Sequence, residues 1–366
     1  MSKRRLVVLF DGTWNKPESN TNVERLRRLV APRDAAGAEQ LVEYIPGVGV
    51  APGMAHLLGG AFGYGLSGNV KDGYRWLCGQ WQPGDEIWLF GFSRGAYTAR
   101  SLGGMIRKCG LLRRDGGAIA DDAVAAAYAF YRDTVVKPGD DAAAAWRAAR
   151  SLETDIHFIG VWDTVGALGI PGTAAWFPFA RKRYQFHDTD LSHIVKHAYQ
   201  ALALDEHRAD FAPTKWTRNP DMLAPGESPT AKKPEQVEVE QRWFVGAHAD
   251  VGGGNDHDGA NRTPDPLSDP PLAWLQRKAM AAGLACKEVF LPLPDAAAGV
   301  PRDSYGEFMD GVYKALKPPF TRVIGGGVNE TVDESVWQHA RLADYRSPTL
   351  EQALRSDAVT PPSGVA

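Results

Sequence analysis

The chain has 366 residues, of which 44% are hydrophobic and 23% charged, a composition typical of a globular enzyme. Its 41 Lys and Arg against 44 Asp and Glu give a formal net charge of −3, which excludes an electrostatic case for nucleic-acid binding. No apolar run approaches the roughly 18 residues that a membrane-spanning helix needs.

The first residues and the cysteine count predict the compartment of the protein and the state of its thiols. Between the charged start of the chain (1–5) and Asp11 there are only five apolar residues, whereas a secretory signal needs an apolar stretch of about 7–15, so we expect no cleaved signal and a cytoplasmic protein. Cys78, Cys109 and Cys286 are odd in number and form no CxxC. They are therefore predicted to be free thiols, and no pattern supports a cysteine nucleophile.

Strands alternate with helices along the first part of the chain. The uninterrupted apolar run Leu6–Phe10 is typical of a strand buried on both faces. The expected elements that follow are a helix over 22–30, a strand over 41–45, a glycine-rich loop over 47–73 leading into a helix near 70–81, a strand over 87–90 and a helix over 96–108. This alternation predicts an α/β fold, a three-layer sandwich with a mostly parallel central sheet.

The second part continues the pattern with insertions. The expected elements are an alanine-rich helical pair inserted at 115–152, a strand over 156–162, a helix over 191–204, a surface excursion at 213–236, a strand over 237–245 and a helix over 271–283. Past Pro292 the chain shows few periodic segments. We interpret residues 1–366 as a single domain of the α/β-hydrolase kind with helical and loop insertions.

Gly91-Phe92-Ser93-Arg94-Gly95 lies directly between the strand over 87–90 and the helix that follows it. The pentapeptide alone fits a plain turn equally well. In this strand-to-helix context it predicts a nucleophile elbow, a strained turn that lifts the serine hydroxyl above the sheet.

Three chemically suitable side chains follow three predicted strands. Ser93, Asp163 and His248 each come at a carboxyl end, where a parallel sheet forms its crevice. Their chain order, Ser-Asp-His, is that of the α/β-hydrolases. We therefore predict a catalytic triad in which His248 takes the Ser93 proton and Asp163 holds the imidazole.

Each triad member also has a plainer interpretation. Asp163 is equally able to cap its own turn, and His248 is one of nine histidines. Only His248 combines a strand end with a following loop of small residues, which ends in Gly252-Gly253-Gly254.

An oxyanion hole needs two backbone N–H groups. One is expected from Arg94, the residue after the nucleophile, and the other from Gly12 or Thr13 in the loop after the first strand. Asp11-Gly12-Thr13 is also consistent with an ordinary turn, in which Asp11 anchors the loop through its side chain.

Other site chemistries fit less well. Residues 47–53 resemble a phosphate-binding loop only in part, because the third glycine is misplaced and Pro52 lacks a donor. Asp250, Asp256 and Asp258 are potential cation ligands without the EF-hand spacing. We predict no metal and no cofactor. Two alternatives to the serine enzyme stay open: a binding protein without turnover, and a metal-dependent phosphoesterase built on Asp11, Asp163, His248 and Asp250.

Several motifs together resemble one family. The segments that carry the resemblance are Phe10-Asp11-Gly12-Thr13-Trp14-Asn15, Gly91-Phe92-Ser93-Arg94-Gly95-Ala96, Trp162-Asp163-Thr164-Val165-Gly166, Leu204-Asp205-Glu206-His207-Arg208, and 246–254 with its terminal Gly252-Gly253-Gly254. They are similar to the α/β-hydrolase domain of the type VI secretion phospholipase effectors, the Tle group of bacteria.

The resemblance implies a serine esterase of the phospholipase A or lipase type, with Ser93, Asp163 and His248 as the triad. It implies a lipid or small ester substrate, contact with a membrane surface, and export without a signal peptide. It assigns no role to Asp205, Glu206 and Arg208. We expect these residues to form a buried ion pair beneath the site. The aromatic residues 176–179 are interpreted either as a lipid-facing rim or as a buried cluster.

Overall fold

The molecule is built on one seven-stranded sheet. A computed structural model describes residues 3–13, 15–49, 59–114, 116, 118–166, 190–254, 265–293, 299–308, 310–342 and 344–362. The strand order is β2-β1-β3-β6-β7-β8-β9, and each neighbouring pair is parallel. The strands are β1 (Arg5–Phe10), β2 (Gln40–Ile45), β3 (Glu86–Phe92), β6 (Ile156–Trp162), β7 (Val195–Ala203), β8 (Glu238–Phe244) and β9 (Glu330–Val332).

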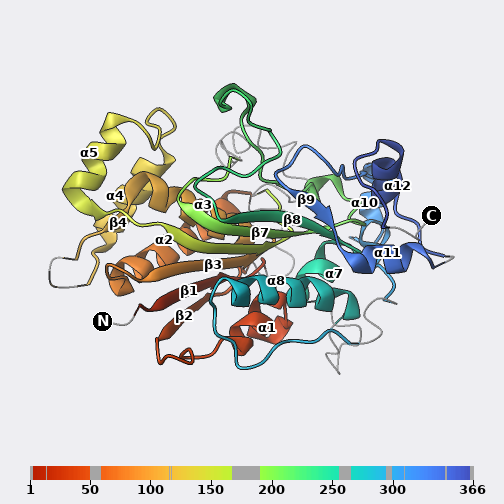
Figure 1. Cartoon of the computed structure of the whole chain (residues 1–366), viewed down its shortest axis with the longest axis horizontal. Helices are drawn as coiled ribbons and strands as arrows, with labels where there is room; N and C mark the ends of the chain where they lie inside the picture. The colour runs from red at the N-terminus through yellow and green to blue at the C-terminus, as the bar shows by residue number, and fades with distance from the viewer. Residues whose placement is uncertain are drawn as a thin grey trace.

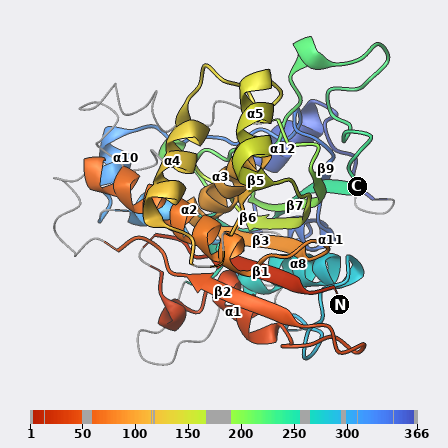
Figure 2. The same cartoon turned by 90° about the vertical axis from the view of Figure 1, so that its left-hand side faces the viewer.

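Helices cover both faces of this sheet (Figures 1 and 2). Alternate side chains of β1 point to opposite faces, so Val8 packs in a cluster with residues of α2 (Gly59–Gln80) and α3 (Arg94–Cys109). Val7 packs in a second cluster with residues of α1 (Asn22–Leu29) and α8 (Asp269–Ala281). The predicted three-layer α/β fold with a parallel central sheet is confirmed.

The inserted segments flank this core. The alanine-rich stretch forms α4 (Asp121–Arg132) and α5 (Asp141–Arg150), and the short strands β4 (Leu111–Leu112) and β5 (Ser151–Leu152) pair antiparallel where they leave and rejoin the core. The stretch 213–236 forms a long loop between β7 and β8 with a single 3-10 turn, Pro220–Met222 (Figure 1).

The helix predicted over 191–204 is wrong, because this stretch contains the strand β7. Its sequence, Val-Lys-His-Ala-Tyr-Gln-Ala-Leu-Ala, shows no clean alternation and is rich in alanine, so a helix was the natural interpretation. Its place between β6 and β8 decides otherwise, since a strand there completes two ladders and buries both of its faces. His197 consequently lies on a strand.

Two further expectations need correction. The glycine-rich loop over 47–73 is wrong in its second half, because α2 begins at Gly59. One glycine there permits close packing: a Cβ on Gly73 would lie 2.7 Å from Cζ of Phe10. The region past Pro292 is also more regular than predicted, with α9 (Ser304–Glu307), α10 (Val312–Leu316), α11 (Glu334–Ala340) and α12 (Pro348–Arg355).

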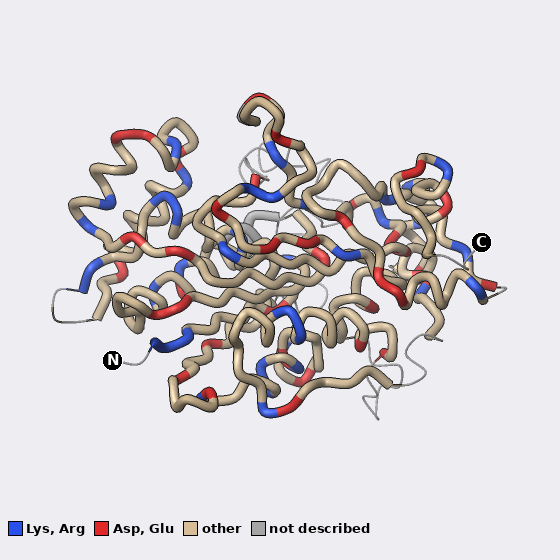
Figure 3. Tube along the Cα trace, viewed as in Figure 1, with Lys and Arg blue, Asp and Glu red and all other residues tan. Residues whose placement is uncertain are grey.

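Charged residues of both signs are interspersed along the described trace (Figure 3). Within the described ranges, no helix is both long and apolar enough to pass through a bilayer.

Candidate active site

Ser93 occupies a strained turn between β3 and α3. Its φ of 58° and ψ of −123° lie outside the regions that non-glycine residues favour. The turn is tied to the next strand because the Ser93 N–H donates to the Trp162 carbonyl at 3.0 Å. The sharp bend forces backbone segments together: a Cβ on Gly91 would lie 2.5 Å from the Gly95 carbonyl oxygen. The local sequence therefore makes the turn, and the turn presents the hydroxyl.

Gly95→Ala is expected to destabilise the fold by about 1–3 kcal/mol, because overpacking of backbone has that cost. A Cβ there would overlap the Phe10 carbonyl oxygen and lie 2.5 Å from that of Asp11, so β1 and the elbow would have to separate. Thermal unfolding measures the effect. Gly79→Ala, in α2 and with nothing within 4 Å of the added Cβ, is the matched control and should be neutral or stabilising. Equal melting temperatures for the two variants would contradict the expectation.

Asp163 directly follows β6 and is completely buried. Its backbone is left-handed, with φ of 38°, and its N–H donates to the Ala201 carbonyl at 2.8 Å. The Ala203 N–H donates to Asp163 Oδ1 at 3.0 Å. The carboxylate is thus fixed against the end of β7, the strand that the sequence did not predict.

His248 begins the short helix α7 (His248–Gly252) just after β8. Its Nδ1 lies 2.6 Å from Asp163 Oδ2, and its Nε2 lies 2.8 Å from Ser93 Oγ. With Nδ1 protonated, the imidazole donates to Asp163, and Nε2 accepts from the serine hydroxyl. The rings of Phe92 and Phe211 flank it, with centroids at 4.8 and 5.1 Å. The structure therefore brings the three predicted side chains into one hydrogen-bonded chain.

The electrostatics of this chain keep the base neutral and the acid ionised. Burial lowers the pKa of His248, and the hydrogen bond that His248 donates to Asp163 only partly opposes that effect. Burial alone would raise the pKa of Asp163, but the Arg322 cation and the hydrogen bonds from His248 and Arg322 hold it well below its usual range. At neutral pH a neutral imidazole therefore lies between a hydroxyl and a carboxylate.

Arg322 is a site residue that the sequence reasoning missed. It lies in the segment between α10 and β9 and is completely buried. Its Nη1 donates to Asp163 Oδ1 at 2.6 Å and its Nη2 to Oδ2 at 2.9 Å. No motif or spacing in the sequence marks it, since its neighbours form no periodic segment.

Glu206 and Arg208 form the buried ion pair that was expected beneath the site. Arg208 Nη2 donates to Glu206 Oε2 at 2.6 Å, and the same oxygen accepts from the His248 backbone N–H at 3.3 Å. The guanidinium lies over the Phe211 ring, with its carbon 3.7 Å from the centroid. The pair therefore supports both the start of α7 and one of the rings that flank the imidazole.

Asp205 supports the other side of the His248 loop. Its Oδ2 accepts from the Gly246 N–H at 2.8 Å, and its own N–H donates to the Gly246 carbonyl at 3.0 Å. The Tyr345 hydroxyl, from the segment before α12, donates to the same carboxylate at 3.0 Å. Asp205 thus fixes the turn that leads from β8 into His248.

The loop after β1 lies next to the elbow. Its Gly12 N–H donates to Asp11 Oδ1 at 2.7 Å, so this donor is already engaged, as the turn interpretation expected. Asp11 is held in turn by the hydroxyls of Tyr44 at 2.6 Å and Thr21 at 2.8 Å. The buried Oγ1 of Thr13 has no hydrogen-bond partner among the described residues. Of the two candidates in this loop, Gly12 has its N–H engaged by Asp11, whereas Thr13 has a hydroxyl without a partner among the described residues.

The residues of the metal-dependent alternative are engaged elsewhere. Both Asp163 oxygens accept from Arg322, both Asp11 oxygens accept from neighbouring donors, and Asp250 Oδ2 accepts from the Ala247 N–H at 2.8 Å. Burial, with Asp265 as a neighbour, raises the pKa of Asp250 to about 7. In the described part of the chain no three acidic, histidine or cysteine side chains gather as a metal site. Asp256 and Asp258 lie outside that part, as do residues 176–179.

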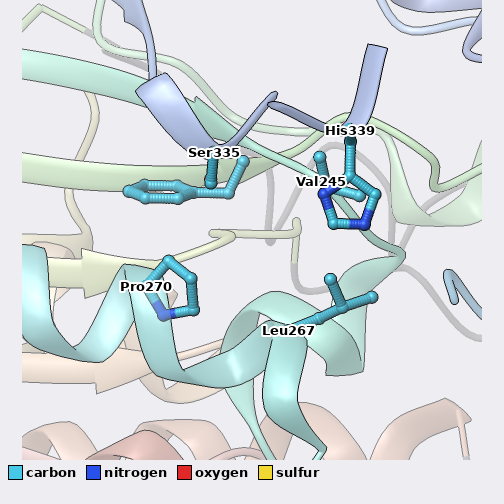
Figure 4. A pocket seen from close by; sticks show the side chains of 6 residues that line it. Val245, Leu267, Pro270, Ser335 and His339 are labelled. Atoms are coloured by element: carbon cyan, nitrogen blue, oxygen red, sulfur yellow. The ribbon is translucent and has the colours of Figure 1, made fainter. Parts of the chain in front are cut away.

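Two other features take no part in the hydrogen bonds that join Ser93, His248 and Asp163. Cys78, Cys109 and Cys286 are unpaired, and burial raises the pKa of the Cys78 and Cys109 thiols to about 12, which is opposite to what a thiolate nucleophile needs. A small pocket is lined by Val245, Leu267 and His339 (Figure 4). Its lining residues form no hydrogen bond with Ser93, Asp163 or His248 among those described.

The chain is similar to several known proteins. The sequence model of a family described as "T6SS, Phospholipase effector Tle1-like, catalytic domain" matches residues 4–278. An uncharacterized protein of Saccharomyces cerevisiae is 30% identical over 244 residues, which are 60% of this chain and 33% of the yeast protein.

Two solved structures are more distant. The crystal structure of an uncharacterized protein from Pseudomonas aeruginosa is 18% identical with a TM-score of 0.47, and the match covers 97% of this chain and 52% of that one. The structure of the Tle1 effector bound to the VgrG spike from the Type 6 secretion system is 18% identical with a TM-score of 0.40, over 71% of this chain and 53% of that one. The chain thus spans about a third of the yeast relative and about half of each solved chain.

Proposed function

Since residues 4–278 match it, the chain belongs to the family of Tle1-like catalytic domains of type VI secretion phospholipase effectors, and from that premise we propose that it is a serine hydrolase of lipid esters. One observation carries the serine mechanism. Ser93 Oγ, His248 and Asp163 follow one another at 2.8 and 2.6 Å, although they come from three separate strand ends. A nucleophile, a base and a group that orients the base are what acyl transfer by serine requires.

The proposed reaction begins with a proton transfer. His248 Nε2 takes the Ser93 Oγ proton as the oxygen attacks the ester carbonyl carbon, and Asp163 stabilises the imidazolium that forms. The bond to the leaving alcohol then breaks as His248 returns the proton to the alcohol oxygen, which leaves an acyl group on Ser93. Water, deprotonated by His248, attacks this acyl-enzyme, releases the carboxylic acid and restores the serine.

The charge on the carbonyl oxygen needs fixed donors. Arg94 begins α3, and its N–H is the proposed first donor at the positive end of the helix. Thr13, through its backbone N–H or its buried hydroxyl, is the proposed second donor. Gly12 becomes a donor in this scheme only if Asp11 releases its N–H.

The substrate class rests on the family. Lipid esters of the phospholipase A or lipase type, contact with a membrane surface, and export by a type VI system follow from the family and belong to this proposal. The rival metal-dependent phosphoesterase has no observation in its favour, because its carboxylates are engaged by Arg322 and by hydroxyl and backbone donors.

The test is a substrate profile with two inhibitors. The purified chain is assayed on p-nitrophenyl esters of rising acyl length and on phospholipid vesicles labelled in one acyl position at a time. We expect ester hydrolysis that survives EDTA and is abolished by a fluorophosphonate, with the label on Ser93. Loss of activity in EDTA that a divalent cation restores would favour the metal enzyme. A folded chain that neither turns over esters nor takes the label would favour a binding protein.

A further inference from the structure

Arg322 makes an ion pair with Asp163 in which both partners are completely buried. Its two terminal nitrogens meet the two carboxylate oxygens at 2.6 and 2.9 Å, the bidentate arrangement that fixes the plane of a carboxylate. The same nitrogens also donate to the backbone carbonyls of Ala203 at 2.8 Å and Phe211 at 2.6 Å. The carbonyls of Ala203, at the end of β7, and of Phe211 therefore hold the guanidinium, which cannot swing away from Asp163.

The Asp163 carboxylate accepts hydrogen bonds from three groups, of which two, Arg322 and His248, are side chains. Oδ1 accepts from Arg322 and from the Ala203 N–H, whereas Oδ2 accepts from Arg322 and from His248 Nδ1. Oδ2, the oxygen that accepts from His248, also lies 2.9 Å from the Arg322 cation. The carboxylate therefore offers a weaker negative potential to an imidazolium at His248 than a carboxylate without a neighbouring cation would.

We infer that Arg322 is a positioning residue for the proposed hydrolysis, which fixes Asp163 against His248 Nδ1 and, by sharing its charge, sets the acid limit of activity. The inference rests on the proposed function. It also assigns a role to the segment that follows α10, which lies beyond the residues that the family model matches.

The other charges around the imidazole do not replace this effect. His248 faces Asp163, Glu206 and Arg208, and Asp163 faces Arg322 and His248. Glu206 and Arg208 act on His248 with opposite signs and are paired with each other at 2.6 Å. Arg322 is therefore the cation that balances Asp163, and its removal would leave an extra negative charge beside His248.

The direction of the effect follows from the role of His248 as a base. Activity needs its neutral form, so kcat/KM is full above the pKa of His248 and falls as the pH decreases through that pKa. Burial lowers this pKa below the ordinary value of about 6.5, which places the acid limb of the wild-type profile below that pH. Loss of Arg322 should raise the pKa and move the acid limb upward.

The experiment compares Arg322→Gln with Arg322→Lys over a pH range from about 4.5 to 9. For Arg322→Gln we expect an acid limb higher by about one pH unit and a plateau kcat/KM lower by roughly 10–100-fold. Lysine keeps the charge but not the planar fork, so Arg322→Lys should lower the plateau and leave the limb near its wild-type position. Arg25→Gln breaks another buried pair, with Asp269 at 2.5 Å, and is the matched control that should not move the limb.

A second measurement does not depend on turnover. The imidazole of His248 is titrated by NMR in the Ser93→Ala protein with and without Arg322→Gln, and the same upward shift of its pKa is expected. If the wild-type chain hydrolyses no ester, the proposed function fails while this titration still tests the electrostatic role. An unshifted acid limb or an unshifted imidazole titration in folded Arg322→Gln would overturn the inference and leave Arg322 a structural residue only. If Arg322→Gln does not fold, the test is made on Arg322→Lys. An acid limb that moves in this variant, which keeps the charge, would also overturn the inference.

Discussion

Ser93→Ala is expected to lower kcat for ester hydrolysis by about 10⁶-fold, the loss that removal of a serine nucleophile causes in a comparable triad. Alanine leaves His248 and Asp163 in place at 2.6 Å but removes the oxygen that would form the acyl-enzyme. Single-turnover and steady-state assays on a p-nitrophenyl ester measure the loss, and fluorophosphonate labelling should vanish with it. A folded Ser93→Ala protein with near wild-type turnover would refute the serine mechanism.

Ser93→Gly separates the loss of activity from any loss of fold. The φ of 58° at this position is strained for alanine and serine alike, whereas glycine adopts it freely. We expect the Ser93→Gly protein to be more stable than the Ser93→Ala protein by about 1 kcal/mol. This difference already includes the cost of the larger backbone entropy that glycine has in the unfolded chain. Thermal unfolding of the two inactive variants measures the difference. A less stable glycine variant would mean that the turn stores no strain.

Asp163→Asn is expected to lower kcat by about 10⁴-fold, because an amide nitrogen facing His248 Nδ1 selects the wrong imidazole tautomer. Asparagine tolerates the left-handed φ of 38° at this position, so the backbone conformation is compatible with the substitution. The assay is run at the pH of the wild-type plateau. A folded variant that keeps more than about a tenth of the activity would contradict the assigned role of the carboxylate.

The same substitution should also destabilise the protein, by about 3–5 kcal/mol, because it leaves the Arg322 guanidinium buried without its counter-charge. Asp163→Asn combined with Arg322→Met removes both charges, and we expect it to recover much of the stability while activity stays lost. This double-mutant cycle by chemical denaturation separates the structural contribution of the pair from its effect on the reaction. Strictly additive losses would show that the two side chains do not interact.

The strand ends were readable from the sequence because apolar residues mark the strands: without interruption over 87–90, nearly so over 156–162, and mainly in the last three positions of 237–245. These stretches became β3, β6 and β8 within a few residues. Since parallel strands end on the same edge of a sheet, the residues after them were expected to meet. Their meeting at hydrogen-bond distance is a matter of tertiary geometry that no spacing could give.

The missed elements lack such local signals. The strand β7 reads as a helix until β6 and β8 are present on either side of it. Arg322 lies 159 residues from Asp163 along the chain, and an isolated arginine in an irregular segment is not distinguishable from a surface residue by sequence. Thr13 emerged over Gly12 only because the Asp11 carboxylate accepts the Gly12 N–H.

By itself the sequence determined the class of fold, the strained serine turn and the order of three reactive side chains, because apolar periodicity and glycine placement act over a few residues. The tertiary structure alone decided which carboxylate oxygen faces the imidazole, which cation balances it, and which loop lies beside the hydroxyl. These are contacts between segments far apart in the chain, fixed by burial and charge pairing.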